Sequence, residues 1–120
     1  MTKERITLGR VGEEAAASYL KKNGLRIIKR NYRCKLGELD IVAMDGPCLV
    51  FIEVRTKAGN TYGLPQESLN EKKKHKLRQL AVYYTLCSNI TDIPQRFDVI
   101  AVTTDRQGTV LKIEHIKNAL

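Results

Sequence analysis

Two segments rich in β-forming residues lie on either side of a turn sequence, and this pairing constrains the fold more than any other feature of the chain. Residues 39–44 and 48–54 are separated by Asp45-Gly46-Pro47, a combination typical of turns. The pattern therefore predicts a β-hairpin.

The register of this hairpin brings acidic side chains together. A turn centred between residues 46 and 47 places Asp40 opposite Glu53. The same register places Glu38 opposite Arg55, which predicts an ion pair beside the two carboxylates. Opposed residues have Cβ atoms about 5 Å apart, and like charges there cost stability. A hard divalent cation removes that conflict and can activate water at a scissile phosphate. Alternatively, Asp40 and Glu53 are surface residues that each pair with a nearby basic side chain, and the residues alone leave both interpretations open.

Side chains alternate between the two faces of a strand. Glu38 and Asp40 are therefore expected on one face of the first strand. Leu39 and Ile41 are expected on the opposite face. Both acidic residues of this strand are thus predicted to lie on the same side of the sheet.

The remaining elements alternate in type along the chain. Apolar spacing predicts helices over residues 7–23 and from near Ser68 or Asn70 to near Ser88. We expect a loop over residues 58–64 and strands over residues 25–30, 97–102 and 109–113. This order predicts one α/β domain over residues 1–120, with helices packed on a mixed sheet.

Each helix is expected to bury one apolar stripe. The stripe of the first helix is predicted to contain Leu8, Val11, Ala15, Tyr19 and Leu20. That of the second is predicted to contain Leu77, Leu80, Ala81 and Tyr84.

The chain carries a formal net charge of +8, which favours a polyanionic partner. Its positive residues gather in two sequence clusters, within residues 21–35 and 72–78. Any one of these residues is adequately explained as a solvated surface residue, but two clusters in 120 residues favour contacts with nucleic-acid phosphates. An anionic membrane would attract the same charge. No predicted helix combines a bulky apolar face with a basic opposite face, so we expect no membrane binding.

Cysteine usage and the absence of an apolar leader predict a cytoplasmic protein. Cys34, Cys48 and Cys87 are widely spaced and form no CxxC pair, which favours reduced thiols over disulfides or a zinc site. No stretch is long enough to span a bilayer. The first ten residues lack the apolar segment of a secretory signal.

Four blocks follow one another along nearly the whole chain. They are Gly9-Arg10-Val11-Gly12-Glu13, Asn31-Tyr32-Arg33 with Gly37-Glu38-Leu39-Asp40, Phe51-Ile52-Glu53-Val54-Arg55-Thr56-Lys57, and Arg96-Phe97-Asp98-Val99. Together they resemble the YraN-like family of small bacterial predicted endonucleases. Asp40 and Glu53-Val54-Arg55 resemble the D…(D/E)xK signature of the restriction-endonuclease-like superfamily.

The resemblance implies a restriction-endonuclease-like fold, a central mixed sheet flanked by helices, similar to the archaeal Holliday-junction resolvases. It implies Mg²⁺ or Mn²⁺ held by Asp40 and Glu53, with Glu13 supplying a further carboxylate. Taken alone, Glu13 is equally well explained as an exposed residue near a helix N-terminus. Resolvase-like nucleases often cut as dimers, so a homodimer is one expected assembly.

Arg55 stands where the superfamily usually has a catalytic lysine. A lysine can lose its proton but an arginine effectively cannot. Arg55 is therefore expected to stabilise charge on the phosphate and not to act as a general base. Lys57 is expected on the same strand face and is a candidate for part of the lysine's role.

Three functions are consistent with these features. The first is a metal-dependent endonuclease acting on DNA rather than RNA, including branched DNA, with catalytic residues Asp40, Glu53, Arg55, Lys57 and Glu13. The second is a nucleic-acid-binding module that has lost cleavage. The third is an adaptor whose basic surface meets an acidic protein. In the first two, the residues expected to contact nucleic acid are Arg10, Arg30, Arg33, Lys35, Lys72, Lys73 and Lys76.

Overall fold

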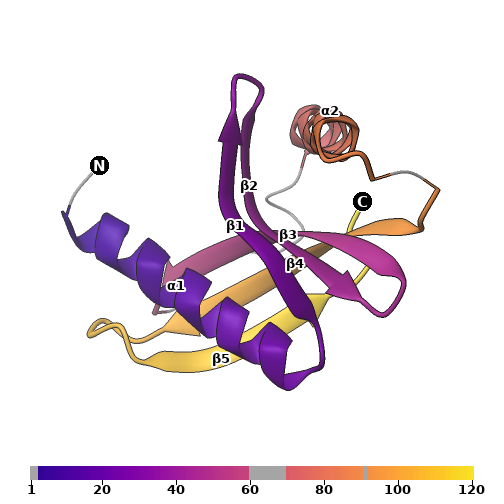
Figure 1. Ribbon diagram of the computed structural model, residues 1–120. Helices are drawn as coiled ribbons and strands as arrows, with labels where there is room; N and C mark the ends of the chain where they lie inside the picture. Colours follow the sequence, from indigo (N-terminus) through magenta and orange to yellow (C-terminus); the bar gives the residue numbers. More distant parts are fainter. Residues whose placement is uncertain (1–2, 60–69, 91) are drawn as a thin grey trace.

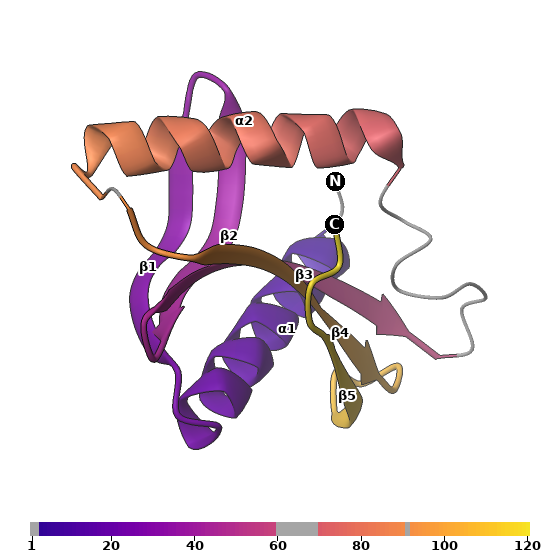
Figure 2. The ribbon, with the colours of Figure 1, turned by 90° about the vertical axis from the view of Figure 1, so that its right-hand side faces the viewer.

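A mixed β-sheet with one helix on each face forms the described part of the chain, residues 3–59, 70–90 and 92–120 of the computed structural model. The elements are α1 (Lys3–Lys22), β1 (Arg26–Cys34), β2 (Gly37–Asp45), β3 (Cys48–Ala58), α2 (Glu71–Cys87), β4 (Gln95–Thr104) and β5 (Val110–Ile116). These strands lie in the order β1-β2-β3-β4-β5, with β3 and β4 parallel and the other neighbours antiparallel. Figures 1 and 2 show α1 and α2 on opposite sides of the sheet.

This architecture confirms the α/β prediction and agrees with a restriction-endonuclease-like fold. The predicted helices and strands are present, with displaced boundaries: β1 continues to Cys34 and β3 to Ala58, beyond their predicted ends at residues 30 and 54. The predicted Ser68 helix start and most of the predicted loop at 58–64 lie outside the described residues. Asn70 caps α2, because its side chain accepts a hydrogen bond from the Lys73 amide at 2.9 Å.

Alternation along the strands divides the core into two layers. One layer joins the sheet to α2 and includes Phe51 and Val99. The other joins the sheet to α1 and includes Val50 and Ile52. The stripe predicted for α2 is confirmed as buried: Leu77, Leu80, Ala81 and Tyr84.

The stripe predicted for α1 is confirmed only in part. Leu20 is fully buried, and Ala15 and Tyr19 are half-buried and pack against the core, whereas Leu8 and Val11 are only half-buried. The helix also turns Gly12 and Ala16 onto the sheet. Small side chains allow α1 to lie close to the strands, and periodicity of the larger apolar residues does not reveal such a face.

Gly12 is the point of closest approach between α1 and the sheet. A Cβ atom on Gly12 would overlap Oγ1 of Thr56 on β3 and would lie 2.9 Å from the Thr56 Cβ. Thr56 is β-branched and stiff, so it has little room to move away. The bare Gly12 backbone therefore sets the spacing between α1 and β3 immediately beside Glu13.

The β1–β2 ladder is interrupted at Asn31 and Asp40. Arg30 pairs with Ile41 and Tyr32 pairs with Leu39, but the two residues between them are not paired. Asn31 has a φ of 53°, a left-handed conformation that asparagine tolerates better than most residues.

The outer part of the hairpin bends at this interruption and rises beside α2 (Figure 1, Figure 2). Tyr32 meets Tyr84 of α2 edge to face, with ring centroids 5.0 Å apart. The bend also overturns the predicted alternation, because Leu39 packs in the α2 layer while Ile41 packs in the α1 layer.

A buried polar network ties β4 and β5 to α1. Asp98 is fully buried and pairs with Arg96 at 3.1 Å and with His115 at 2.7 Å. The other ring nitrogen of His115 lies 3.2 Å from the Tyr19 hydroxyl. The Asp98 carboxylate is therefore held between a guanidinium and an imidazole.

Cys34, Cys48 and Cys87 are all free thiols, as predicted. Among the described helices, neither is long and apolar enough to cross a membrane.

Two glycines of α1 provide a matched test of the packing. Gly12→Ala is expected to lower the free energy of unfolding by about 1–3 kcal/mol, because the new methyl group overpacks the contact with Thr56. Gly9→Ala has open space around its new Cβ and is expected to raise the free energy of unfolding by about 0.5–1 kcal/mol. Urea denaturation measures both. A stabilising Gly12→Ala would contradict the close contact between α1 and β3.

Candidate metal centre

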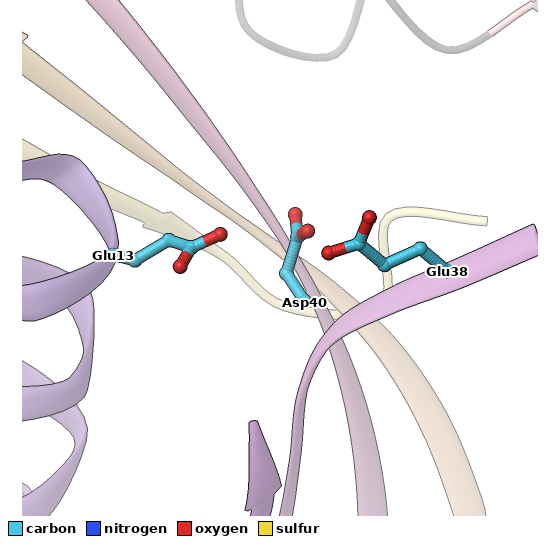
Figure 3. A group of neighbouring side chains, drawn as sticks. All are labelled: Glu13, Glu38 and Asp40. Atoms are coloured by element: carbon cyan, nitrogen blue, oxygen red, sulfur yellow. The ribbon is translucent and has the colours of Figure 1, made fainter. Parts of the chain in front are cut away.

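Three carboxylates converge beside the bend in the β1–β2 hairpin. Glu13 comes from α1, and Glu38 and Asp40 come from β2 (Figure 3). One oxygen of each lies within 4.8 Å of an oxygen of each of the others. In Figure 3 the three side chains point toward one another.

Two local features of the backbone bring these residues together. The close contact of Gly12 with Thr56 carries the neighbouring Glu13 toward the sheet. The interrupted ladder at Asn31 and Asp40 leaves the Asp40 position open instead of enclosing it between paired strands. The carboxylates therefore meet where the helix comes closest to the bend.

Asp40 occupies the end of the β2–β3 ladder. The predicted register is confirmed, since the paired residues run from Asp45 with Cys48 to Ile41 with Ile52. Asp40 and Glu53 are the next opposing positions, and Oδ2 of Asp40 accepts a hydrogen bond from the Val54 amide at 2.9 Å. The Asp40 side chain thus continues the hydrogen bonding where the backbone ladder stops.

The environment of Asp40 disfavours its charged form. Burial raises its pKa to about 7, the neighbouring Glu53, Glu13 and Glu38 add to the rise, and the Val54 amide opposes it. A nearby positive charge would therefore strongly stabilise the ionised form of this carboxyl group.

Glu53 lies beside this cluster but not within it. Its carboxylate is 3.5 Å from Nη2 of Arg55 and 3.5 Å from Nζ of Lys73 on α2. Burial raises the pKa of Glu53, while Arg55 and a hydrogen bond with Asp40 oppose the rise. The sequence predicted Asp40 and Glu53 as neighbours, and the structure brings them together.

The predicted ion pair between Glu38 and Arg55 is wrong. Among the described residues, Glu38 pairs with Arg33 at 3.5 Å, and Arg55 pairs with Glu53. The bend of the hairpin separates the two residues that a straight ladder would have opposed. Glu38 instead points at Glu13 and Asp40.

Arg55 and Lys57 line one open cleft together with Glu13 and Asp40. The shared placement agrees with the prediction that Arg55 and Lys57 lie on the same face of the strand. Two nitrogens of Arg55, Nε and Nη2, are buried without a hydrogen-bond partner among the described residues, and of these Nη2 faces the Glu53 carboxylate at 3.5 Å. A guanidinium with unused donors beside a carboxylate cluster is suited to bind an anion such as a phosphate.

The predicted nucleic-acid contacts are spread over several elements. Lys73 lies at the site through its pair with Glu53, and Arg30 pairs with Glu14 at 2.8 Å. The others are exposed on α1, the β1–β2 hairpin or α2: Arg10, Arg33, Lys35, Lys72 and Lys76. The first sequence cluster is no compact patch, because it extends along the nine residues of β1, at about 3.3 Å per residue.

Two residues of the site were missed from the sequence. Glu38 was assigned to an ion pair, although alternation already placed it on the face of Asp40, and that signal was sufficient to include it. No pattern in the sequence indicated that Asn31 belongs to the site. Its side-chain amide, oriented with the nitrogen toward the carboxylates, donates to Glu13 Oε2 and to Glu38 Oε1, both at 3.2 Å.

The donor set fits a hard divalent cation. Glu13, Glu38 and Asp40 offer carboxylate oxygens, the ligands that Mg²⁺ and Mn²⁺ prefer, and the set includes no sulfur or imidazole. Their mutual repulsion, expressed in the raised pKa of Asp40, is the conflict that such an ion relieves.

Comparison with known proteins identifies the family. Residues 12–102 match the model of the uncharacterised protein family UPF0102. The chain belongs to the UPF0102 family. Within it, the chain is 54% identical over 119 residues to a UPF0102 protein of Pelotomaculum thermopropionicum, covering 99% of each chain. It is 50% identical to a UPF0102 protein of Moorella thermoacetica, again over 99% of each chain, and 49% identical to one of Desulforamulus reducens over the full length of both.

Membership of UPF0102 confirms the YraN-like resemblance. The matched span, residues 12–102, contains the three carboxylates and also Asn31 and Glu53. The names of these UPF0102 relatives state no activity.

Replacing Asp40 tests the electrostatic conflict. The folded carboxyl keeps its proton up to about pH 7, whereas an unfolded one loses it near its ordinary pKa of 3.8, so ionisation lowers the stability of the fold between these values. Asp40→Asn removes this loss of stability, and the amide oxygen of the new side chain can still accept a hydrogen bond from the Val54 backbone N–H. In EDTA, the change in Tm on substitution is expected to be at least about 3 °C more favourable at pH 8 than at pH 5.

The matched control is Glu71→Gln, because the Glu71 side chain is 88% exposed and pairs with Lys74 on the same helix. Its change in Tm is expected to be the same at both pH values. If Asp40→Asn destabilised the protein more at pH 8 than at pH 5, the repulsion inferred at Asp40 would be refuted.

Proposed function

We propose that this protein is a metal-dependent endonuclease that hydrolyses phosphodiester bonds in DNA, including branched DNA. The observation that supports it most is the convergence of Glu13, Glu38 and Asp40 next to Arg55, whose buried Nε has no hydrogen-bond partner among the described residues. Carboxylates that hold a cation and a guanidinium that holds a phosphate are the two components of a phosphodiesterase site.

Each residue of the cleft has a distinct role in this proposal. Glu13, Glu38 and Asp40 bind Mg²⁺ or Mn²⁺, which when bound supplies charge stabilisation and an activated water. Glu53 lies beside them, where its carboxylate orients Arg55 and Lys73. Arg55 binds the scissile phosphate and stabilises the charge that develops on it.

Proton transfer requires a group other than Arg55, since a guanidinium keeps its proton. Lys57 is our candidate, because it lines the same cleft as Asp40 and Arg55. A lysine near bound cationic groups loses its proton more easily than one in solution.

The net charge of +8 favours binding to a polyanion, and this supports DNA as the substrate. Lys73 pairs with Glu53 beside the carboxylate cluster, and exposed basic side chains lie on α2 and on the β1–β2 hairpin: Lys72, Lys76, Arg33 and Lys35. A duplex bound across α2 and the hairpin would place a phosphate near Arg55. Assembly as a homodimer would match a two-fold symmetric junction.

A second function is favoured by one specific observation. Arg55 replaces the usual lysine, and both Arg55 and Lys73 lie within 3.5 Å of Glu53. Such pairing lowers the capacity of Glu53 to bind a cation. A nucleic-acid-binding module without cleavage is therefore the alternative, and an adaptor for an acidic protein is the third candidate.

A cleavage assay separates these functions. Purified protein is incubated with linear, flapped and four-way-junction DNA in Mg²⁺ or Mn²⁺, beside Asp40→Asn and the control Glu114→Gln, whose carboxylate pairs with Lys112 on β5. We expect metal-dependent cleavage by the wild type and Glu114→Gln, with at least a hundredfold loss in Asp40→Asn. DNA binding by Asp40→Asn should persist, because a negative charge is removed.

Other outcomes identify the alternatives. Absence of cleavage, together with salt-sensitive DNA binding by both wild type and Asp40→Asn, would replace the nuclease proposal with the binding module. Absence of cleavage and of DNA binding would leave the adaptor. Equal cleavage by wild type and Asp40→Asn would show that the hydrolysis has another source.

A further inference from the structure

Asn31 combines two properties that a bend alone does not require. Its φ of 53° accounts for an asparagine or a glycine at this point of β1. The backbone conformation does not account for the side chain, whose amide is directed at the carboxylates of Glu13 and Glu38. A glycine would give the same bend without this contact.

In the absence of a cation, the Asn31 amide donates hydrogen bonds to carboxylate oxygens of the cluster. With its nitrogen toward the carboxylates, the amide has three acceptor oxygens at 3.2 Å for its two N–H donors: Oε1 and Oε2 of Glu13 and Oε1 of Glu38. These hydrogen bonds join α1 to β2 across the cluster and reduce the repulsion between the two carboxylates. Asn31 and Asp40 occupy opposing positions of β1 and β2, between the pairs Arg30–Ile41 and Tyr32–Leu39.

The same amide carries an oxygen on its other side. When carboxylates bind a cation, an N–H group directed at that ion is unfavourable, whereas a carbonyl oxygen is a ligand that hard divalent ions accept. Rotation of the terminal amide exchanges the two atoms in the same space. The side chain therefore suits the cluster in both its metal-free and its metal-bound state.

We propose that Asn31 is a fourth residue of the cation site, donating through its amide nitrogen in the metal-free protein and presenting its amide oxygen to the bound ion. This inference rests on the proposed cation site of the nuclease and adds a residue to it. It assigns Asn31 a role in metal affinity that is separate from its role in the backbone.

Calorimetric titration with Mn²⁺ alone tests the proposal without relying on cleavage. Asn31→Gly keeps the left-handed backbone and removes the amide, so Mn²⁺ affinity is expected to fall at least about tenfold while the protein stays folded by circular dichroism. Asn31→Asp retains an oxygen donor, so its affinity is expected to equal or exceed that of the wild type.

Asn89→Gly is the matched control. Asn89 is also left-handed, with a φ of 55°, and it is exposed beyond the C-terminal end of α2. Lys73 at the site lies near the opposite end of this 17-residue helix, and a helix of that length spans about 25 Å. Asn89→Gly is therefore expected to leave Mn²⁺ affinity unchanged.

The outcomes distinguish this inference from the proposed function. Wild-type Mn²⁺ affinity in Asn31→Gly would overturn the role of Asn31 and leave the carboxylate site intact. Equal weakening in Asn31→Gly and Asn31→Asp would overturn the oxygen-ligand role, because the N–H donors would then be what matters. Failure of the wild type to bind Mn²⁺ would overturn both the inference and the cation site.

Discussion

The interruption of the β1–β2 ladder at Asn31 and Asp40 is the constraint on which the rest of the site depends. A left-handed residue in β1 prevents pairing at this point, and the outer hairpin bends toward α2 as a consequence. The bend turns Glu38 toward Asp40 and leaves the Asp40 carboxylate to accept from Val54. A continuous ladder would have paired Asp40 with Asn31 and enclosed this position between the two strands.

The contact of Gly12 with Thr56 completes the geometry from the α1 face of the sheet. It allows α1 to approach β3 closely enough for Glu13 to reach the bend. The cluster thus joins a helix and a strand whose relative placement is set by packing away from the carboxylates. Each of its charges has a partial counterpart: Arg33 for Glu38, Asn31 for Glu13, and a backbone amide for Asp40.

Much of this arrangement could be predicted from the sequence because local patterns determine it. The turn residues fixed the β2–β3 register, and the apolar spacing of α2 identified its buried face correctly. The sheet-facing residues of α1 were missed because Gly12 and Ala16 are small and carry little periodic signal. Glu38 was paired with Arg55 because the hairpin register was extended along a straight ladder, and the bend depends on the conformation of Asn31, a residue on the neighbouring strand.

Titration of Mn²⁺ into Glu38→Gln and Glu14→Gln tests the central claim most directly. Both carboxylates pair with an arginine of β1, at 3.5 Å and 2.8 Å respectively, but of the two only Glu38 belongs to the cluster with Glu13 and Asp40. The account predicts that Glu38→Gln binds Mn²⁺ at least about tenfold more weakly than wild type and that Glu14→Gln binds it equally well. Equal affinity in all three proteins would contradict a cation site built on these carboxylates.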